Sequence, residues 1–320
     1  MDMSFFKSRK LWVLGLALII LVGLATLPLY GSLYMTILMT AILMYIILTV
    51  SWVIFSGPSG YLSLASAAFF GVGIYTSAIL LPNTGAVFPV IVVVLIAGAI
   101  SFVLAVLVGA LTLRLKGIYF AIFTFGLVVL VKEVLIFFEI SVTGTRGRFI
   151  MLVDTHTIFY IMLGIFVVLM LTAYFIRRSK FGLALRSIGE NEEAAAHSGV
   201  NVTMVKVITF GISAVFMGAA GAVIAMRWTY IDPYIAFNPL FSFLPVLMAI
   251  FGGLGQFYGP LIGAAIFAYL EETLLTKFPY YYMLIFGCVL VGTMLFMPMG
   301  LTGLIQKGWR RLIGGQHADA

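Results

Sequence analysis

The interval 177–201 holds the densest group of charged and polar side chains in the chain, and their types suit docking. Asn191 can cap a short helix, because its side-chain oxygen accepts from free backbone N–H groups. Glu192 and Glu193 then lie in the first turn, where the helix dipole favours carboxylates. Gly199 supplies the left-handed residue that ends such a helix. The pattern predicts a capped polar helix outside any apolar segment.

Two short helices are expected in this interval, at 181–188 and 192–198, separated by Gly189. Ala194 and Ala195 give the second helix a small surface that can settle into a groove on another protein. Arg186 and the glutamates would add polar contacts at the edges of the groove. A solvated amphipathic loop without a partner is the alternative interpretation.

Residues for catalysis are scarce. Cys288 is the single cysteine, so the chain has no intramolecular disulfide and no cysteine-based metal site. The three histidines lie in separate regions, and no pair of catalytic groups at one depth is evident, which argues against an intramembrane enzyme. The glycine-rich run at 251–260 lacks the lysine and the spacing of a phosphate-binding loop. We therefore expect no catalytic residues, no bound cofactor or metal, and no ATP site on this chain.

A few ionisable residues fall inside apolar segments, where they are costly unless they serve a purpose. They are Lys132, Glu133, Glu139, Glu271 and Glu272. We interpret them as interfacial pairs or helix anchors. A place in a translocation path, or coupling to an ion gradient, are the alternatives.

The elements that must position these residues are apolar helices. The chain is 63% hydrophobic and 9% charged, and runs of about 20 apolar residues recur, the length that crosses the hydrocarbon core. The composition predicts an all-α integral membrane protein, a polytopic bundle of about ten transmembrane helices, with eight or nine as the alternative. The eighth run is short and is expected to be a partial or re-entrant segment. The runs lie at 11–30, 33–55, 61–81, 87–113, 118–140, 158–176, 204–226, 239–251, 259–275 and 281–299.

The positions of Lys and Arg predict the orientation, since basic residues collect in cytoplasmic loops. With ten spans, most of the 18 basic residues fall on one side, which places both termini in the cytoplasm. We expect a cytoplasmic N-terminus at 1–10, an uncleaved first helix, one transmembrane domain at 11–305 with a cytoplasmic loop at 177–203, and a cytoplasmic tail at 306–320. The net charge of +7 then reflects topology and contact with anionic membrane lipid rather than nucleic acid.

The loop resembles the cytoplasmic loop of membrane subunits of ATP-binding cassette importers. That loop carries Glu-Ala-Ala followed after a gap by glycine, matched here by Glu193, Ala194, Ala195 and Gly199. The string at 181–201 is similar to that of LivM-type permeases of branched-chain amino acid importers. Further similarity lies at 60–80, 114–126 and 251–265, so the resemblance covers about residues 35–305.

The resemblance implies a type II importer-like fold and a division of labour. Two separate ATPase subunits would bind ATP and Mg and dock on the loop, through Arg186, Glu192, Glu193, Ala194, Ala195 and Gly199. A second, LivH-type permease would complete the pathway, and an extracytoplasmic solute-binding protein would deliver the solute. The expected location is the cytoplasmic (inner) membrane of a bacterium or archaeon.

Small and polar residues in two regions are candidates for the pathway or its gating, because small side chains let helices approach closely in lipid. Static packing is the equally open alternative. The candidates are Tyr61, Ser63, Ser66, Gly71, Gly73, Gly252, Gly253 and Gly255.

Two departures from the family pattern leave the solute open. Ala65 and Ser66 replace a larger polar residue, and the stretch at 143–148 carries arginines in place of an acidic residue. Arg146 and Arg148, with Arg227, are candidates for docking the solute-binding protein. For Arg146 and Arg148, attraction of a carboxylate and ordinary solvated charge are the alternatives. Branched-chain amino acids are the expected solute, with urea, short amides or aromatic acids as alternatives. A self-sufficient, ion-coupled secondary transporter is the alternative of another class.

Overall fold

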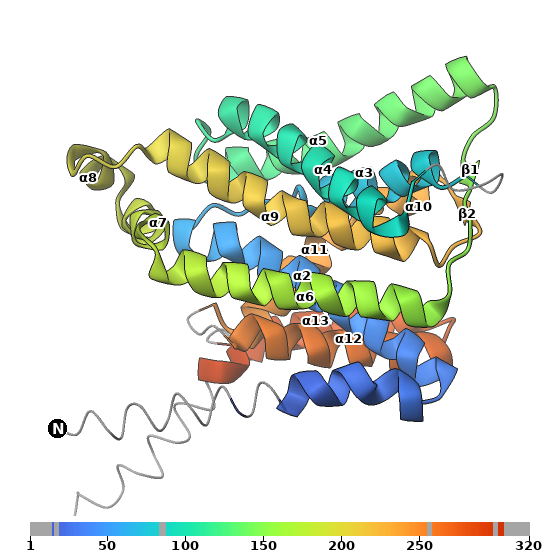
Figure 1. Cartoon of the computed structure of the whole chain (residues 1–320). Coiled ribbons are helices and arrows are strands. Elements are labelled where there is room, and N and C mark those ends of the chain that lie inside the picture. Colours follow the sequence, from blue (N-terminus) through green and yellow to red (C-terminus); the bar gives the residue numbers. More distant parts are fainter. Residues whose placement is uncertain (1–14, 16–18, 83–87, 255–257, 297–299, 304–320) are drawn as a thin grey trace, which may run out of the picture.

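The computed structural model describes residues 15, 19–82, 88–254, 258–296 and 300–303. Most helices run lengthwise through one bundle, with α7 and α8 at one end and the strands β1 and β2 at the other (Figure 1). A helix over Ile19–Tyr30 comes first. The elements that follow are α2 (Leu33–Ser59), α3 (Ser66–Leu80), α4 (Val90–Thr112), α5 (Ile118–Phe138), the π-helical turn η1 (Glu139–Thr143), β1 (Arg148–Phe149), α6 (Thr155–Arg178), α7 (Lys180–Glu190), α8 (Glu192–His197), α9 (Val202–Ala225), β2 (Tyr230–Ile231), α10 (Pro233–Ala236), α11 (Leu240–Gly252), α12 (Gly259–Lys277) and α13 (Tyr282–Phe296).

The expected helical membrane protein is confirmed, and each predicted apolar run contains a helix within the part of it that the structure describes. Within the described residues, six helical segments are long and apolar enough to cross a membrane. They are Leu33–Ser59, Val90–Thr112, Ile118–Val142, Thr155–Arg178, Val202–Ala225 and Pro233–Gly252. The eighth run is short as expected, since α11 has 13 residues and contains Pro245.

One small element was not predicted. Strands β1 and β2 pair antiparallel, with Arg148 opposite Ile231, and Pro82 bridges to Ile150 beside them. These contacts bring the ends of α3, η1 and α9 together at one end of the bundle. Among the described residues, the all-α expectation fails only at these short strand pairs.

The core of the bundle is built on α2 and α9. In an apolar stretch of each span, 72% of the residues of α2 and 78% of those of α9 are buried. The corresponding share is 22% for the span that contains α5. Gly73 of α3 lies directly against the backbone of Gly218 of α9, so a side chain at Gly73 would collide with that backbone. Close approach of this kind replaces the hydrophobic effect as the source of helix association in lipid.

The predicted third span is broken. Residues 60–65 are not helical, and α3 begins only at Ser66. Several polar backbone groups of residues 60–65 are paired with side chains of other helices. The Trp52 indole donates to the Ser63 carbonyl at 2.7 Å, and the Leu64 amide donates to Thr124 Oγ1 at 3.0 Å. Irregular backbone is tolerated among membrane helices only where protein satisfies it in this way.

Ser242 of α11 makes the same kind of contact from the other side. Its hydroxyl donates to the Leu64 carbonyl at 2.7 Å and accepts from the Ala67 amide at 3.1 Å. Three helices, α2, α5 and α11, therefore hold residues 60–65 through Trp52, Thr124 and Ser242. We call residues 60–65 the broken segment.

Candidate functional site

The polar loop between α6 and α9 forms two helices, as the sequence predicts, but the predicted break at Gly189 is wrong, because Gly189 lies inside α7 and the helices are separated at Asn191. Asn191 Oδ1 accepts from the amides of Glu193 and Ala194, both at 3.0 Å, so the predicted cap is confirmed. Gly199 has φ +84°, and the Val200 amide donates back to the Ala195 carbonyl at 3.2 Å. A left-handed glycine with this back-donation closes α8.

The loop has a small core of its own. Leu185 and Ile188 of α7 pack with Ala195 of α8 and Val205 of α9. Of the alanines in α8, Ala195 is thus turned inward, while Ala194 is exposed. The face left for a partner carries Glu193 and Ala194.

Glu192, the first residue of α8, is anchored to the bundle. Its carboxylate accepts from the Tyr61 hydroxyl at 2.6 Å and from Lys206 Nζ at 2.9 Å, while Lys116 lies at 3.9 Å. Burial raises the pKa of Glu192, but the hydrogen bonds from Tyr61 and Lys206 and the positive charges outweigh it, so the pKa lies below its usual value. Glu192 therefore stays ionised at neutral pH.

Lys206 is the centre of this contact. Its ammonium donates to Glu192, to the Leu113 carbonyl at 2.9 Å and to the Tyr61 hydroxyl at 3.1 Å, and its side chain is 3% exposed. The burial of Lys206 is not evident from the sequence, and these three acceptors replace its water. Together Glu192, Lys206 and Tyr61 form what we call the anchor cluster. It joins α8 to α9, to the end of α4 and to the broken segment.

Of the pathway candidates, Tyr61 and Ser63 lie in the broken segment, and Ser66 begins α3. The Ser66 hydroxyl is buried and has no hydrogen-bond partner among the described residues. Of these three residues, Tyr61 is the one with a hydrogen bond to the described polar loop.

The glycine candidates lie at close contacts. Gly71 faces the Phe237 ring, and Gly252 lies against the backbone of Gly259. Gly253 has φ +98°, a conformation that suits glycine at the end of α11. Gly255 lies outside the described residues.

The candidate docking arginines lie near the opposite end, and two of them are already paired within the chain. Arg146 Nε donates to Asp232 at 2.8 Å, and Arg148 Nε donates to the buried Glu139 at 3.3 Å. Arg227 is half-buried. Asp232 and Glu139 had no assigned partner in the sequence analysis, because their pairing depends on the β1–β2 contact.

Metal ligation has no support in the part of the chain that is described. No group of three His, Cys, Asp or Glu residues there could hold an ion. Cys288 is free and exposed on α13.

These features define a polytopic helical membrane protein whose polar loop is bound to the core of the bundle by an anchored helix. The sequence profile of the family described as "Branched-chain amino acid transport system / permease component" matches residues 34–294. The chain belongs to this family. The family consists of transport components rather than enzymes.

Individual relatives agree with this assignment. The high-affinity branched-chain amino acid transport system permease protein LivM of Salmonella typhimurium is 27% identical over 295 residues, covering 82% of this chain and 68% of the relative. The LivM protein of Escherichia coli is 28% identical with the same coverage. A probable LivH permease of Methanocaldococcus jannaschii is 27% identical over 55% of this chain and 54% of the relative. No solved structure matches the chain.

Proposed function

We propose that this chain is the membrane-spanning permease subunit of an ATP-driven importer for branched-chain amino acids in the inner membrane of a bacterium or archaeon. The substrate class follows from the names of the family and of its relatives. In the proposed arrangement the chain crosses the membrane ten times, and both termini and the end that carries α7 and α8 face the cytoplasm. The ATP sites, with Mg, lie on two separate ATPase subunits.

The observation that carries the coupling part of this proposal is the anchor cluster. Glu192 starts α8, and its carboxylate is held by Lys206 inside the bundle and by Tyr61 of the broken segment. A displacement of α8 is therefore transmitted to α9 and to residues 60–65 without passing through a flexible linker. An ATPase subunit that grips the exposed face of α8 would move these elements when ATP binding closes the ATPase pair.

Two further partners belong to the proposal. A second, LivH-type permease would form the pathway together with this chain, since LivM and LivH proteins both occur among its relatives. An extracytoplasmic solute-binding protein would dock at the end that carries β1 and β2. Because Arg146 and Arg148 are engaged within the chain, their contribution to that docking is through the exposed edges of their guanidinium groups.

The test is mild detergent extraction of the tagged chain from its native membrane, followed by identification of co-purifying proteins and an ATPase assay. We expect two ATPases and a second permease, and uptake of leucine, isoleucine and valine that requires ATP. A chain recovered alone, with uptake that follows an ion gradient, would overturn the proposal in favour of a secondary transporter.

A further inference from the structure

A cavity of about 500 Å³ opens beside the polar loop, bounded by α2, α6, α7 and the start of α12. It combines two kinds of lining. Val50, Val53 and Ile54 of α2 form an apolar part. Arg177 and Arg186 bring two positive charges to the same space, which Glu190 also lines.

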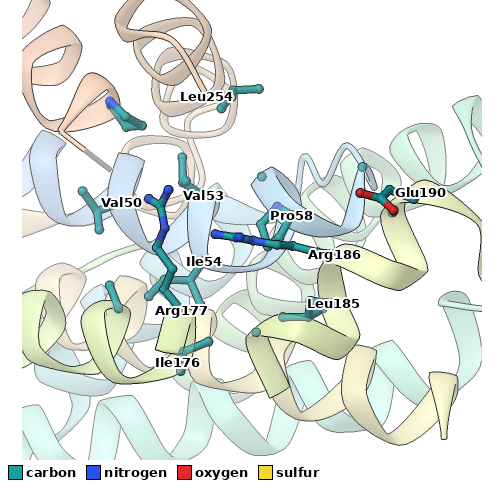
Figure 2. A pocket seen from close by; sticks show the side chains of 16 residues that line it. Val50, Val53, Ile54, Pro58, Ile176, Arg177, Leu185, Arg186, Glu190 and Leu254 are labelled. Atoms are coloured by element: carbon teal, nitrogen blue, oxygen red, sulfur yellow. The ribbon is translucent and has the colours of Figure 1, made fainter. Parts of the chain in front are cut away.

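The two arginines come from different helices. Arg186 extends from α7 toward Arg177 at the end of α6, and its guanidinium is turned away from Glu190 (Figure 2). Within the described part of the chain, no ion pair or hydrogen bond involves Arg186. Two like charges facing one cavity repel each other, and an anion between them would remove that cost.

The cavity lies where a lipid headgroup would be. Arg177 is in the last turn of the membrane-spanning helix Thr155–Arg178. From there the apolar lining runs inward along α2, since Val50 lies nine residues before the helix ends at Ser59, about 13 Å at 1.5 Å per residue. Charge at the mouth and apolar side chains deeper in the span match a phosphate attached to an acyl chain.

We propose that this cavity binds an anionic phospholipid, with its phosphate between Arg177 and Arg186 and an acyl chain along Val50, Val53 and Ile54. Basic pockets between membrane helices on the cytoplasmic side suit anionic headgroups, and guanidinium groups pair with phosphate in a fork geometry. A free phosphate shares the charge but makes no use of the apolar wall, so the lipid is the favoured source. The bound lipid would brace α7, and with it α8, against α2 and α6.

The chain offers a matched control next to the site. Arg178 follows Arg177 in α6, but its guanidinium lies over the Tyr174 ring at 4.5 Å and it does not line the cavity. Arg178→Gln removes the same charge from the same helix end. The two substitutions therefore separate a specific site from general attraction of basic residues to the membrane surface.

The experiment measures the apparent thermal unfolding midpoint of the full chain in neutral detergent while phosphatidylglycerol, diacylglycerol or inorganic phosphate is added. We expect phosphatidylglycerol alone to raise the midpoint of the unmodified chain and of Arg178→Gln. The Arg177→Gln, Arg186→Gln double variant loses two charge-assisted contacts, so it should need more than about tenfold more lipid for the same rise in the midpoint.

Arg186→Gln alone is the second variant, because Arg186 is exposed on α7 and its loss leaves the bundle core intact. This single variant should also need more lipid for the same rise in the midpoint, and it serves as the test if the double variant does not fold. If phosphatidylglycerol raised the midpoint equally in the unmodified chain and in the variants at Arg177 and Arg186, the proposal would be overturned. If inorganic phosphate raised the unfolding midpoint as much as the lipid does, the ligand of the cavity would be a free anion and not a lipid.

Discussion

At the scale of single residues, the loop depends on one buried lysine. Lys206 carries a full charge at 3% side-chain exposure, and it is stable there because Glu192, the Leu113 carbonyl and the Tyr61 hydroxyl replace its water. Removing one member of a buried ion pair leaves the other charge without its partner, which costs more than the pair contributes. Lys206 therefore has a larger role than its position near the start of α9 suggests.

We expect Lys206→Met to lower the free energy of unfolding by about 2–3 kcal/mol, at or below the lower end for buried pairs because Glu192 remains partly hydrated. Lys116→Met is the control. Its ammonium is 63% exposed and 3.9 Å from Glu192, so its loss should cost about 0.5 kcal/mol or less. Denaturant titrations of both variants in mixed micelles measure the difference. Equal effects of the two substitutions would show that burial of Lys206 adds nothing.

The anchor cluster also makes a prediction about pH. Because the folded pKa of Glu192 is depressed, its contribution to stability is present above the unfolded pKa of about 4.3 and is lost as the pH falls through the folded value. The difference in unfolding midpoint between the unmodified chain and Glu192→Gln should stay constant from pH 5 to 8 and shrink below about pH 4. A difference that instead disappears between pH 6 and 8 would contradict this assignment of the ionised form.

At the scale of elements, α8 is closed by a glycine that no other residue replaces without strain. Gly199 has φ +84° and open space around its Cα, so a substitution there acts through the backbone alone. Gly199→Val should cost about 1–2 kcal/mol locally, because the left-handed region is unfavourable for L-residues and more so for β-branched ones.

If α8 is the coupling helix, Gly199→Val should lower uptake severalfold while the assembled importer still hydrolyses ATP. Gly126→Val in α5 is the control, since a side chain there meets nothing within 4 Å and the φ angle is not positive. Uptake and ATPase activity are measured on the same vesicles. Normal coupling in the Gly199 variant would remove α8 from the coupling path.

The contact between α3 and α9 is a second test at this scale. A side chain at Gly73 would overlap the Gly218 backbone, which cannot rotate away as a flexible side chain can. Gly73→Val should therefore lower stability by about 1–3 kcal/mol, as overpacking does. Gly164→Val in α6, where nothing lies within 4 Å, should leave the unfolding midpoint nearly unchanged. A tolerated Gly73→Val would mean that the two helices can separate without cost.

Local features of these elements were readable in the sequence, and contacts between them were not. The cap at Asn191 and the stop at Gly199 follow from residues within one short helix, so their chemistry predicts them. The Tyr61–Glu192 contact joins residues 131 positions apart and depends on how the broken segment and α8 pack. The break before α3 was missed for a related reason, because its apolar run looks continuous and Trp52, Thr124 and Ser242, which pair with its backbone, lie on other helices.

At the scale of the whole molecule, the two polar ends of the bundle should lie on opposite sides of the membrane. The structure separates α7 and α8 from β1 and β2 by the length of the helices (Figure 1). The excess of basic residues near α7 and α8 predicts that this end faces the cytoplasm. Because Cys288 is the single cysteine, Cys288→Ser gives a background without thiols. Single cysteines can then report each end separately.

In that background, Ser187→Cys on the exposed side of α7 and Thr229→Cys beside β2 place one thiol at each end. A membrane-impermeant maleimide is added to intact cells whose outer envelope admits small molecules. It should label Thr229→Cys. Ser187→Cys should react only after the membrane is permeabilised. The reverse pattern would invert the orientation, and α8 would then face away from any cytoplasmic ATPase. A charged maleimide cannot cross the hydrocarbon core to reach a thiol on the other side of the membrane. Labelling of both thiols in intact cells would therefore mean that the two ends are not separated by the membrane.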